Sequence, residues 1–267
     1  SRRRCSIGGS GFGLDGGTSY NFALCILFGF IFSLAWFSAY YFTGARKYRA
    51  GLVVLALVVG GSGLSPLYHF LYKHDFSSAA SAASDTTRAL WANTRFIGMY
   101  DKQADTDFAK KLLGENQASV TTQELPLETI AYTTQLGDYH PPLGGFVLLL
   151  LALACIAWLE QQPNNRAAQG LLAFSVPLTL ITNAWVFPLQ LLLVLGWIAM
   201  RILQQQRPRY DFLLAGFALG MALVLPFLTH FVGQTQSASL RLIEAADRVS
   251  TLKVIIMIWP MLILVAL

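Results

Sequence analysis

Charged residues are scarce in this sequence. Asp, Glu, Lys and Arg make up 12% of the 267 residues, whereas hydrophobic residues make up 55%. A soluble domain is about one quarter charged, so this composition excludes an ordinary soluble fold and indicates a chain solvated by lipid. The net charge is +5, but the basic residues stand in short loops between apolar runs, where the positive-inside rule explains them. We therefore expect no nucleic-acid partner.

Cysteine is scarce as well. Only Cys5, Cys25 and Cys155 occur, without a CxxC pair, which excludes a cysteine-based metal site. Two of them lie inside apolar runs, where they act as small hydrophobic residues. The sequence begins without Met, has no signal-peptide pattern at its start, and stops inside an apolar run. We expect an internal part of a longer polytopic protein.

Long apolar runs are abundant, and a helix needs roughly 20 apolar residues to cross the hydrocarbon core. They predict an all-α integral membrane protein, a polytopic bundle of about seven spans. The expected spans are Tyr20–Phe42, Ala50–Leu64, Leu143–Leu159, Gly170–Asn183, Phe187–Met200, Phe212–His230 and Leu252–Leu267.

The loops between these runs predict an orientation. Residues 44–49, 160–166 and 201–211 alternate onto one side and collect the positive charge of the short loops, so this side is expected to be cytoplasmic. The other side receives residues 65–142, 183–187 and 231–251, which hold eleven of the fourteen acidic residues, and all four histidines also fall there. Side chains capable of chemistry are thus concentrated on the extracytoplasmic face. The alternative explanation is that a long loop outside the membrane holds most of the polar residues whatever its function.

The predicted organisation has three parts. Residues 1–64 contain the first two spans, residues 65–142 form a long extracytoplasmic loop, and residues 143–267 contain five further spans with an outer loop at 231–251. Within the long loop, the small-residue stretch 77–84 is expected to be flexible or a cap. Residues 86–100 and 105–113 have the pattern of short amphipathic helices, the second with acids at its start and lysines near its end, as the helix dipole favours.

The junction before the third span is the first candidate site. Asp138 and His140 flank Tyr139 just before two prolines, and Glu124 and Glu128 stand on the approach. Carboxylates and an imidazole can coordinate a divalent cation such as Mg²⁺ or Mn²⁺, or engage a phosphate. The alternative is that Asp138 only caps the third span and His140 lies among the lipid head groups.

Two further candidates lie on the same predicted side. Asn183 and Trp185 form a turn between spans, where they either line a cavity or only satisfy backbone groups and anchor the turn at the interface. Arg241 and Arg248 belong to the last outer loop, on a predicted amphipathic helix. Arginine suits phosphate oxygens, but ion pairing with Glu244 and Asp247 on a surface helix explains them equally.

Motifs in a fixed order across the sequence resemble those of one family. They are Tyr20–Leu24, Trp91–Arg95, Glu124–Pro126, Leu136–His140, Thr182–Pro188 and Leu225–Phe227. Together they are similar to the YYY-domain membrane proteins, an uncharacterised family of large polytopic proteins from bacteria and archaea. Its patterns are close to E-F-P-x-x-S-F-x-x-G-D-L-H-x-H and N-T-W-D-F-P. Pro142 stands in place of the second histidine, which puts a two-histidine metal site in doubt, and Val186 replaces the aspartate.

That family in turn resembles the GT-C glycosyltransferases, membrane enzymes that use polyprenyl-phosphate-linked sugars outside the cytoplasm. The stretch from His140 to Gly144 is also similar to the H-P-P-L-G-K element of protein O-mannosyltransferases. The resemblance implies a GT-C-like multi-pass protein of the bacterial or archaeal plasma membrane, with a lipid-linked sugar donor and a glycan or protein acceptor. It also implies that the catalytic base lies before Ser1.

On this interpretation Asp138 and His140 bind the phosphate or metal end of the donor. Glu124, Asn183 and Trp185 surround them, and Arg241 or Arg248 clamps the phosphate. A transporter or flippase for a lipid-linked or anionic solute explains the spans equally well. The spans contain almost no charge, which disfavours transport, whereas Pro177 inside the fourth span favours it. A structural envelope subunit would need no acidic cluster at a span entrance.

Overall fold

A computed structural model of the chain is all-helical over the residues that it describes, as the sequence predicts. These are residues 15–59, 67, 70, 73–74, 76–92, 106–108, 111, 130, 133, 137, 141–232, 251, 254–255, 258–259 and 262. The chain divides into two compact units. The first comprises Ser1–Val54 and Gly137–Gln236, and the second comprises Leu55–Leu136 and Ser237–Leu267.

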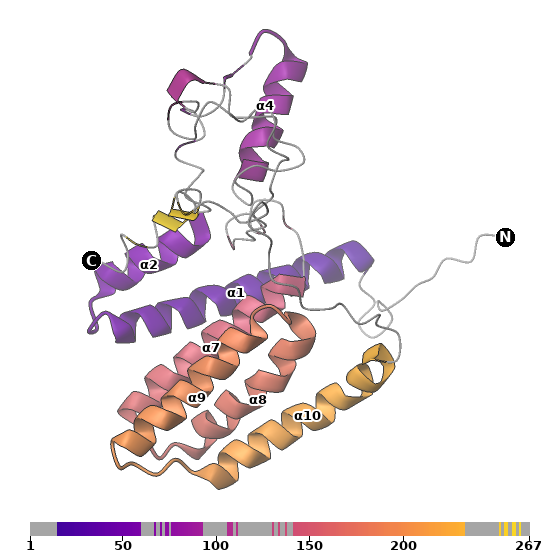
Figure 1. Ribbon diagram of the computed structural model, residues 1–267. Helices are drawn as coiled ribbons and strands as arrows, with labels where there is room; N and C mark the ends of the chain where they lie inside the picture. The colour runs from indigo at the N-terminus through magenta and orange to yellow at the C-terminus, as the bar shows by residue number, and fades with distance from the viewer. Residues whose placement is uncertain are drawn as a thin grey trace, which may run out of the picture. The chain divides into compact units, whose positions relative to one another are not determined.

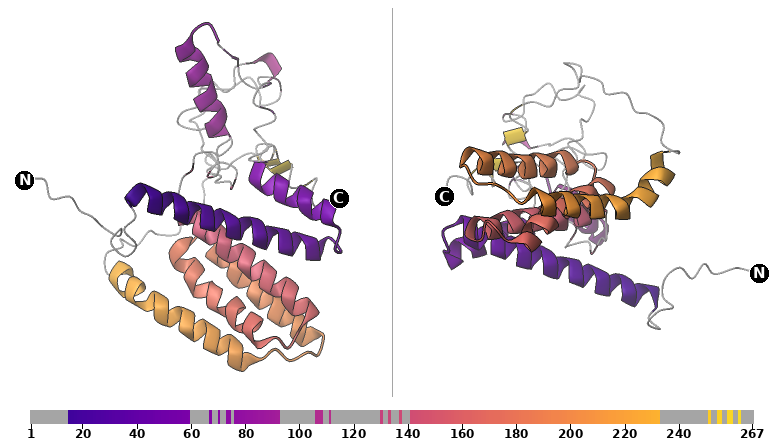
Figure 2. Two further views of the ribbon diagram at one scale, coloured as in Figure 1. Left: turned by 180° about the vertical axis from the view of Figure 1, so that it is seen from behind. Right: turned by 90° about the horizontal axis from the view of Figure 1, so that it is seen from below.

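The first unit is a helical bundle (Figure 1). Its helices are α1 (Gly16–Phe42), α7 (Pro141–Gln161), α8 (Arg166–Thr182), α9 (Phe187–Leu203) and α10 (Tyr210–Val232), and α2 (Lys47–Val59) begins in it. Helix α8 contacts α7, α9 and α10, and α1 packs on α7 (Figure 2). Because three helices cover α8, polar as well as apolar side chains along it are buried.

The closest helix approach in this bundle joins α8 and α10. A β-carbon built on Gly216 would lie 2.8 Å from the carbonyl carbon of Gly170, and one on Gly220 would lie 2.7 Å from the carbonyl oxygen of Phe174. The two α10 glycines form a G-x-x-x-G pattern, the small-residue motif that lets backbones of membrane helices touch. These glycines therefore set the distance between the two helices.

Helix α1 begins at a side-chain cap. Oδ1 of Asp15 accepts a hydrogen bond from the backbone N–H of Thr18 at 2.7 Å, and Oδ2 accepts one from its hydroxyl at 3.1 Å. Such a cap satisfies one of the free amides of the first turn. The same two bonds favour the ionised carboxylate and lower the pKa of Asp15 below its usual 3.8.

Three of the described helices are long and apolar enough to cross a membrane: Gly16–Phe42, Pro142–Gln161 and Tyr210–His230. Helices α8 and α9 have 17 residues each and α2 has 13, so they reach about 20–25 Å at 1.5 Å per residue, short of a ~30 Å core. The count of seven spans thus stays a prediction, and most of the expected span 252–267 lies outside the described residues. Large apolar side chains on α10 face outward, among them Leu214, Leu219 and Leu223, as a lipid-facing helix requires.

In the second unit the structure describes one longer helix, α4 (Ala79–Ala92). It begins where the sequence analysis expects a flexible or capping stretch, and most of that stretch is helical because alanine is a strong helix former. The hydroxyl of Ser78 accepts from the backbone N–H of Ser81 at 3.1 Å and so caps the helix start.

Candidate functional site

The start of α7 and the end of α8 meet at one end of the first unit. A β-carbon on Gly145 would lie closer than 3.0 Å to Cβ of Asn183, and one on Gly144 would lie 3.5 Å from Cβ of Thr182. The sequence predicts a candidate site at each of these two helix ends. Spacing along the chain could not show that they are neighbours, and in the structure the two backbones approach as closely as glycine permits.

The turn before α7 is attached to the start of α1. Gly137 has a φ of +62°, a left-handed conformation that favours glycine. Its carbonyl oxygen accepts a hydrogen bond from the hydroxyl of Tyr20 at 3.1 Å, and Leu24 packs next to it. Three chain segments therefore gather at this end of the unit: the first turns of α1, the approach to α7 and the end of α8.

Asn183 organises the turn between α8 and α9. Its side-chain oxygen accepts from the backbone N–H groups of Trp185 and Val186 at 3.2 and 3.3 Å. Its carbonyl oxygen accepts from Val186 and Phe187. The side-chain NH₂ of Asn183 donates to none of the described residues. Trp185 is 95% exposed at the tip of the turn, where an indole suits the membrane interface.

A buried polar triad joins α8 and α9 next to this turn. The amide of Gln190 on α9 donates to the hydroxyl of Ser175 at 2.7 Å, and its oxygen lies 2.6 Å from the hydroxyl of Thr179. All three residues are fully buried. Because their polar groups satisfy one another or helix carbonyls, the triad holds the last turns of α8 to the first turn of α9 and so fixes the position of Asn183.

Five of the predicted site residues lie outside the described residues. They are Glu124, Asp138, His140, Arg241 and Arg248. Of the predicted set, the structure therefore describes Asn183 and Trp185. The described part of the chain contains no group of three or more His, Cys, Asp or Glu residues that could hold a metal ion, so the Mg²⁺ or Mn²⁺ site predicted at Asp138 and His140 stays a prediction.

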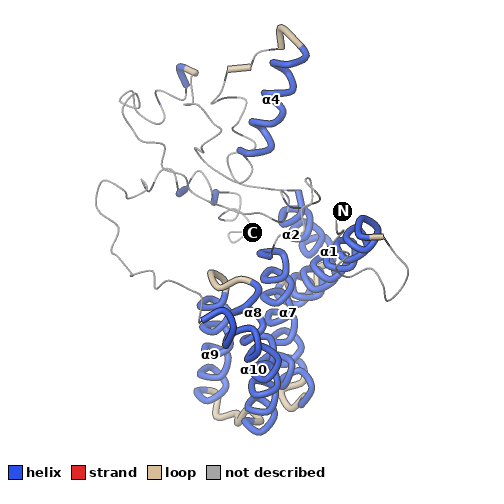
Figure 3. Tube along the Cα trace, turned by 90° about the vertical axis from the view of Figure 1, so that its right-hand side faces the viewer, coloured by secondary structure: helices blue, strands red, loops and turns tan. Residues whose placement is uncertain are grey.

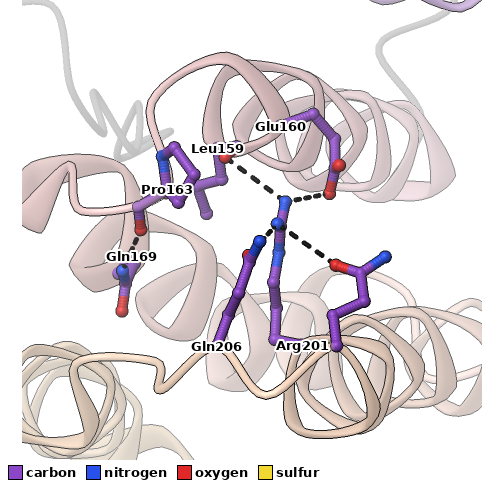
Figure 4. A network of polar contacts seen from close by, with 7 residues as sticks. Leu159, Glu160, Pro163, Gln169, Arg201 and Gln206 are labelled. Atoms are coloured by element: carbon purple, nitrogen blue, oxygen red, sulfur yellow. Dashed lines mark hydrogen bonds and ion pairs between the residues drawn. The ribbon is translucent and has the colours of Figure 1, made fainter.

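A second polar cluster, at the opposite end of the unit, was missed by the sequence analysis. Arg201 on α9 reaches the end of α7, where its guanidinium pairs with Glu160 and contacts the carbonyl of Leu159 (Figure 4). Its place between two apolar runs predicts a loop position, but it lies in α9 and is 4% exposed. Glu160 lies 41 residues away in sequence, so no local pattern could have revealed the pair.

Gln169 ties together the two loops at this end. Its amide donates to the carbonyl of Pro163 at 2.7 Å, and its oxygen accepts from the backbone N–H of Arg209 at 2.7 Å. The α7–α8 and α9–α10 loops thus lie at one end and the Asn183 turn at the other (Figure 3). This is the alternation that the sequence analysis proposed for these three loops.

The second unit contains a further pair that the sequence analysis did not single out. Nδ1 of His74 lies 2.9 Å from Oδ2 of Asp85 on α4, and Asp85 is 6% exposed. The His74 ring also stacks on Phe76. We interpret this pair as a structural contact that holds His74, which precedes α4, against the helix.

The family comparison covers nearly the whole chain. A family model described as "Uncharacterized membrane protein (DUF2298)" matches residues 6–267. No curated protein and no solved structure matches the chain.

Proposed function

The chain belongs to the DUF2298 family of uncharacterised membrane proteins, and from that premise we propose that it is part of a GT-C-type glycosyltransferase. It would transfer a sugar from a polyprenyl-phosphate donor to a glycan or protein acceptor at the extracytoplasmic face of the plasma membrane of a bacterium or archaeon. The observation that carries the proposal is the contact of Gly145 with Asn183. It joins the two helix ends whose motifs resemble the YYY-domain proteins, a family that in turn resembles that superfamily.

The proposed reaction is an inverting displacement. The acceptor oxygen forms a bond to the anomeric carbon while the bond from that carbon to the phosphate oxygen breaks, and the departing lipid phosphate keeps the electron pair. A carboxylate takes the acceptor proton. Asp138 and His140 lie within seven residues of Gly145 in sequence and would hold the phosphate end of the donor, directly or through a cation.

Each remaining residue of the proposed site has a defined task. The free NH₂ of Asn183 donates to a phosphate or sugar oxygen, and Trp185 holds the turn at the membrane surface. Glu124 belongs to the shell around the donor phosphate, and Arg241 or Arg248 would balance the charge of the leaving phosphate. A divalent cation would supply the same charge stabilisation. Since Pro142 replaces the second histidine, donor phosphate oxygens would have to complete its coordination.

The test uses the full-length protein in isolated membranes. Donors are polyprenyl phosphates carrying radiolabelled mannose or glucose, and the measurement is label transferred to glycan or protein. Asp138→Asn should abolish transfer, whereas Asp101→Asn, a matched change elsewhere in the long outer loop, should leave it near the wild-type rate. A wild-type rate in the Asp138→Asn variant would reduce Asp138 to a helix cap. Loss of transfer upon chelation would support the cation.

A transporter or flippase is the second candidate, because Pro177 and the polar triad interrupt the apolar interior of α8. It predicts a different measurement. In proteoliposomes the protein should then move the lipid-linked sugar between leaflets without transferring it to an acceptor. Neither the wild type nor the Asp138→Asn variant should form a glycosylated product. Flux without transfer would replace the enzyme proposal.

A further inference from the structure

A groove of 610 Å³ runs along the surface of the first unit between α8 and α10. Helix α10 packs mainly on α8, and the two helices lie at one edge of the bundle (Figure 1). Four of the nine residues around the groove are small: Ala167, Gly170, Ala215 and Gly216. The two backbones touch at Gly170 and Gly216, and the small residues leave a space beside this contact.

The groove is apolar along its length. Leu171, Phe174, Phe212 and Leu219 line it, and Arg166 is the one charged side chain among the described residues around it. It follows α8 from residue 166 to residue 174, about 12 Å at 1.5 Å per residue. Since α10 is long and apolar enough to cross a membrane, and Leu171 and Leu219 are exposed, the groove opens toward hydrocarbon. Water there would lack hydrogen-bond partners, so the bilayer supplies an acyl chain as the occupant.

Arg166 places an unpaired positive charge at one end of the groove. Its guanidinium lies 5.5 Å from the centre of the Phe212 ring, a cation–π contact that keeps it beside the apolar wall. No carboxylate in the described part of the chain forms an ion pair with it. Arg209 lies at the same distance from the same ring, but Asp211 pairs with it at 2.8 Å. One of the two positive charges at Phe212 is therefore uncompensated.

Two helices begin at this end of the groove. Helix α8 starts at Arg166 and α10 starts at Tyr210, and the start of a helix carries the positive end of its dipole. The dipoles add to the charge of Arg166 and favour an anion where the apolar groove ends. In the predicted orientation this end is cytoplasmic, and the cytoplasmic leaflet of a membrane contains anionic lipids. The groove and the charge therefore match the two parts of one lipid molecule.

We propose that the groove between α8 and α10 binds an acyl chain of an anionic phospholipid and that Arg166 pairs with the phosphate of its head group. A neutral lipid would fill the groove but leave the charge unpaired, and a soluble phosphate would pair with the charge but leave the groove unfilled. A basic residue beside an apolar groove between membrane helices selects a lipid by its head-group charge. This site lies at the opposite end of the unit from the proposed transfer site and does not depend on that function.

The test is photo-crosslinking of the full-length protein in nanodiscs. The probes are phosphatidylglycerol and phosphatidylcholine with the same diazirine-labelled acyl chain, since both contain a phosphate but only phosphatidylglycerol has a net negative charge. Mass spectrometry of the digested protein gives the ratio of the two labels at the groove, residues 166–174 and 212–219. We expect this ratio to exceed the ratio at Leu223, an exposed residue of α10 outside the groove. Equal ratios would overturn the proposal.

Two variants test the charge and the groove separately. Arg166→Gln should lower the ratio at the groove about fivefold, the effect of one arginine next to a charged head group. Its matched control is Arg207→Gln, an exposed arginine at the same end that does not line the groove. Ala215→Leu fills the groove and should remove most of the phosphatidylglycerol label there. Its matched control is Ala218→Leu, an exposed alanine of α10 outside the groove. Both controls should label like wild type.

Three results would contradict the assignment even if phosphatidylglycerol is enriched. An equal loss in the two arginine variants would mean general attraction by surface charge. An unchanged label in Ala215→Leu would mean that the acyl chain does not occupy the groove. A wild-type groove without label from either lipid would mean that another protein segment, such as a second copy of the chain, covers it. Melting temperatures show whether each variant is folded, and the arginine pair decides the question if Ala215→Leu is unfolded.

Discussion

Adding one methyl group at Gly145 tests the contact between the two helix ends of the candidate site. The new β-carbon would lie closer than 3.0 Å to Cβ of Asn183 and 3.1 Å from its Cγ, whereas carbon atoms prefer 3.5–4.0 Å. The helix ends must therefore separate by roughly 0.5–1 Å. Overpacking of this kind costs about 1–3 kcal/mol, and Asn183 cannot yield alone because its side chain and carbonyl bind the following turn.

Gly144→Ala is the matched control for this change. Its β-carbon would lie 3.5 Å from Thr182, an ordinary contact. Both substitutions gain the same helix propensity, up to about 1 kcal/mol, so this term cancels in the comparison. We expect Gly145→Ala to be less stable than Gly144→Ala by about 1–3 kcal/mol, measured by reversible unfolding in detergent. Equal stability of the two variants would refute the close approach of α7 and α8.

Three other predictions concern the rest of the first unit and the topology. Gly216→Ala should destabilise the protein by about 1–3 kcal/mol, because its β-carbon would meet α8, whereas Gly196→Ala, with open space around it, should be neutral or slightly stabilising. In a background without native cysteines, cysteine at Asp101 should react with an impermeant thiol reagent in intact cells and cysteine at Arg46 should not; the reverse pattern would invert the topology. The hydrogen bonds that lower the pKa of Asp15 stabilise the cap fully above the unfolded pKa of about 3.9, and this stabilisation is lost as the pH falls through the lower pKa of the folded state. The amide signal of Thr18 should therefore titrate with a midpoint below pH 3.8 in NMR spectra. A midpoint at or above pH 3.8 would exclude the cap.

Most of the described bundle could be predicted from the sequence, because long apolar runs leave a membrane protein few alternatives to helices. The expected start of the third span at Leu143 differs from the observed start of α7 by two residues, since proline fits the first helical turn. The contact of Gly145 with Asn183 was not predictable in the same way. A hydropathy pattern gives the depth of each helix end but not its neighbours in the membrane plane.

The polar contacts illustrate the same limit. Gln190 reads as one polar residue in an apolar run, and only the packing of α9 on α8 shows that it binds Ser175 and Thr179. Arg201 reads as part of a basic loop, but α9 continues to Leu203 and carries it into the bundle. In both cases the partners lie on different helices, whereas helical periodicity relates only residues within one helix. The G-x-x-x-G pattern at Gly216 was the one local signal that could have predicted the α8–α10 contact.

The two polar clusters bear on the choice between enzyme and transporter. The triad joins α8 to α9 near the Asn183 turn, and Arg201 joins α9 to α7 at the other end. An alternating-access movement of α9 against its neighbours would break buried hydrogen bonds at both ends, each costing about 1–3 kcal/mol if left unsatisfied. A transferase that receives its donor laterally from the bilayer needs no such movement. The same contacts that would resist transport keep Asn183 in a fixed position, which a site for in-line displacement requires.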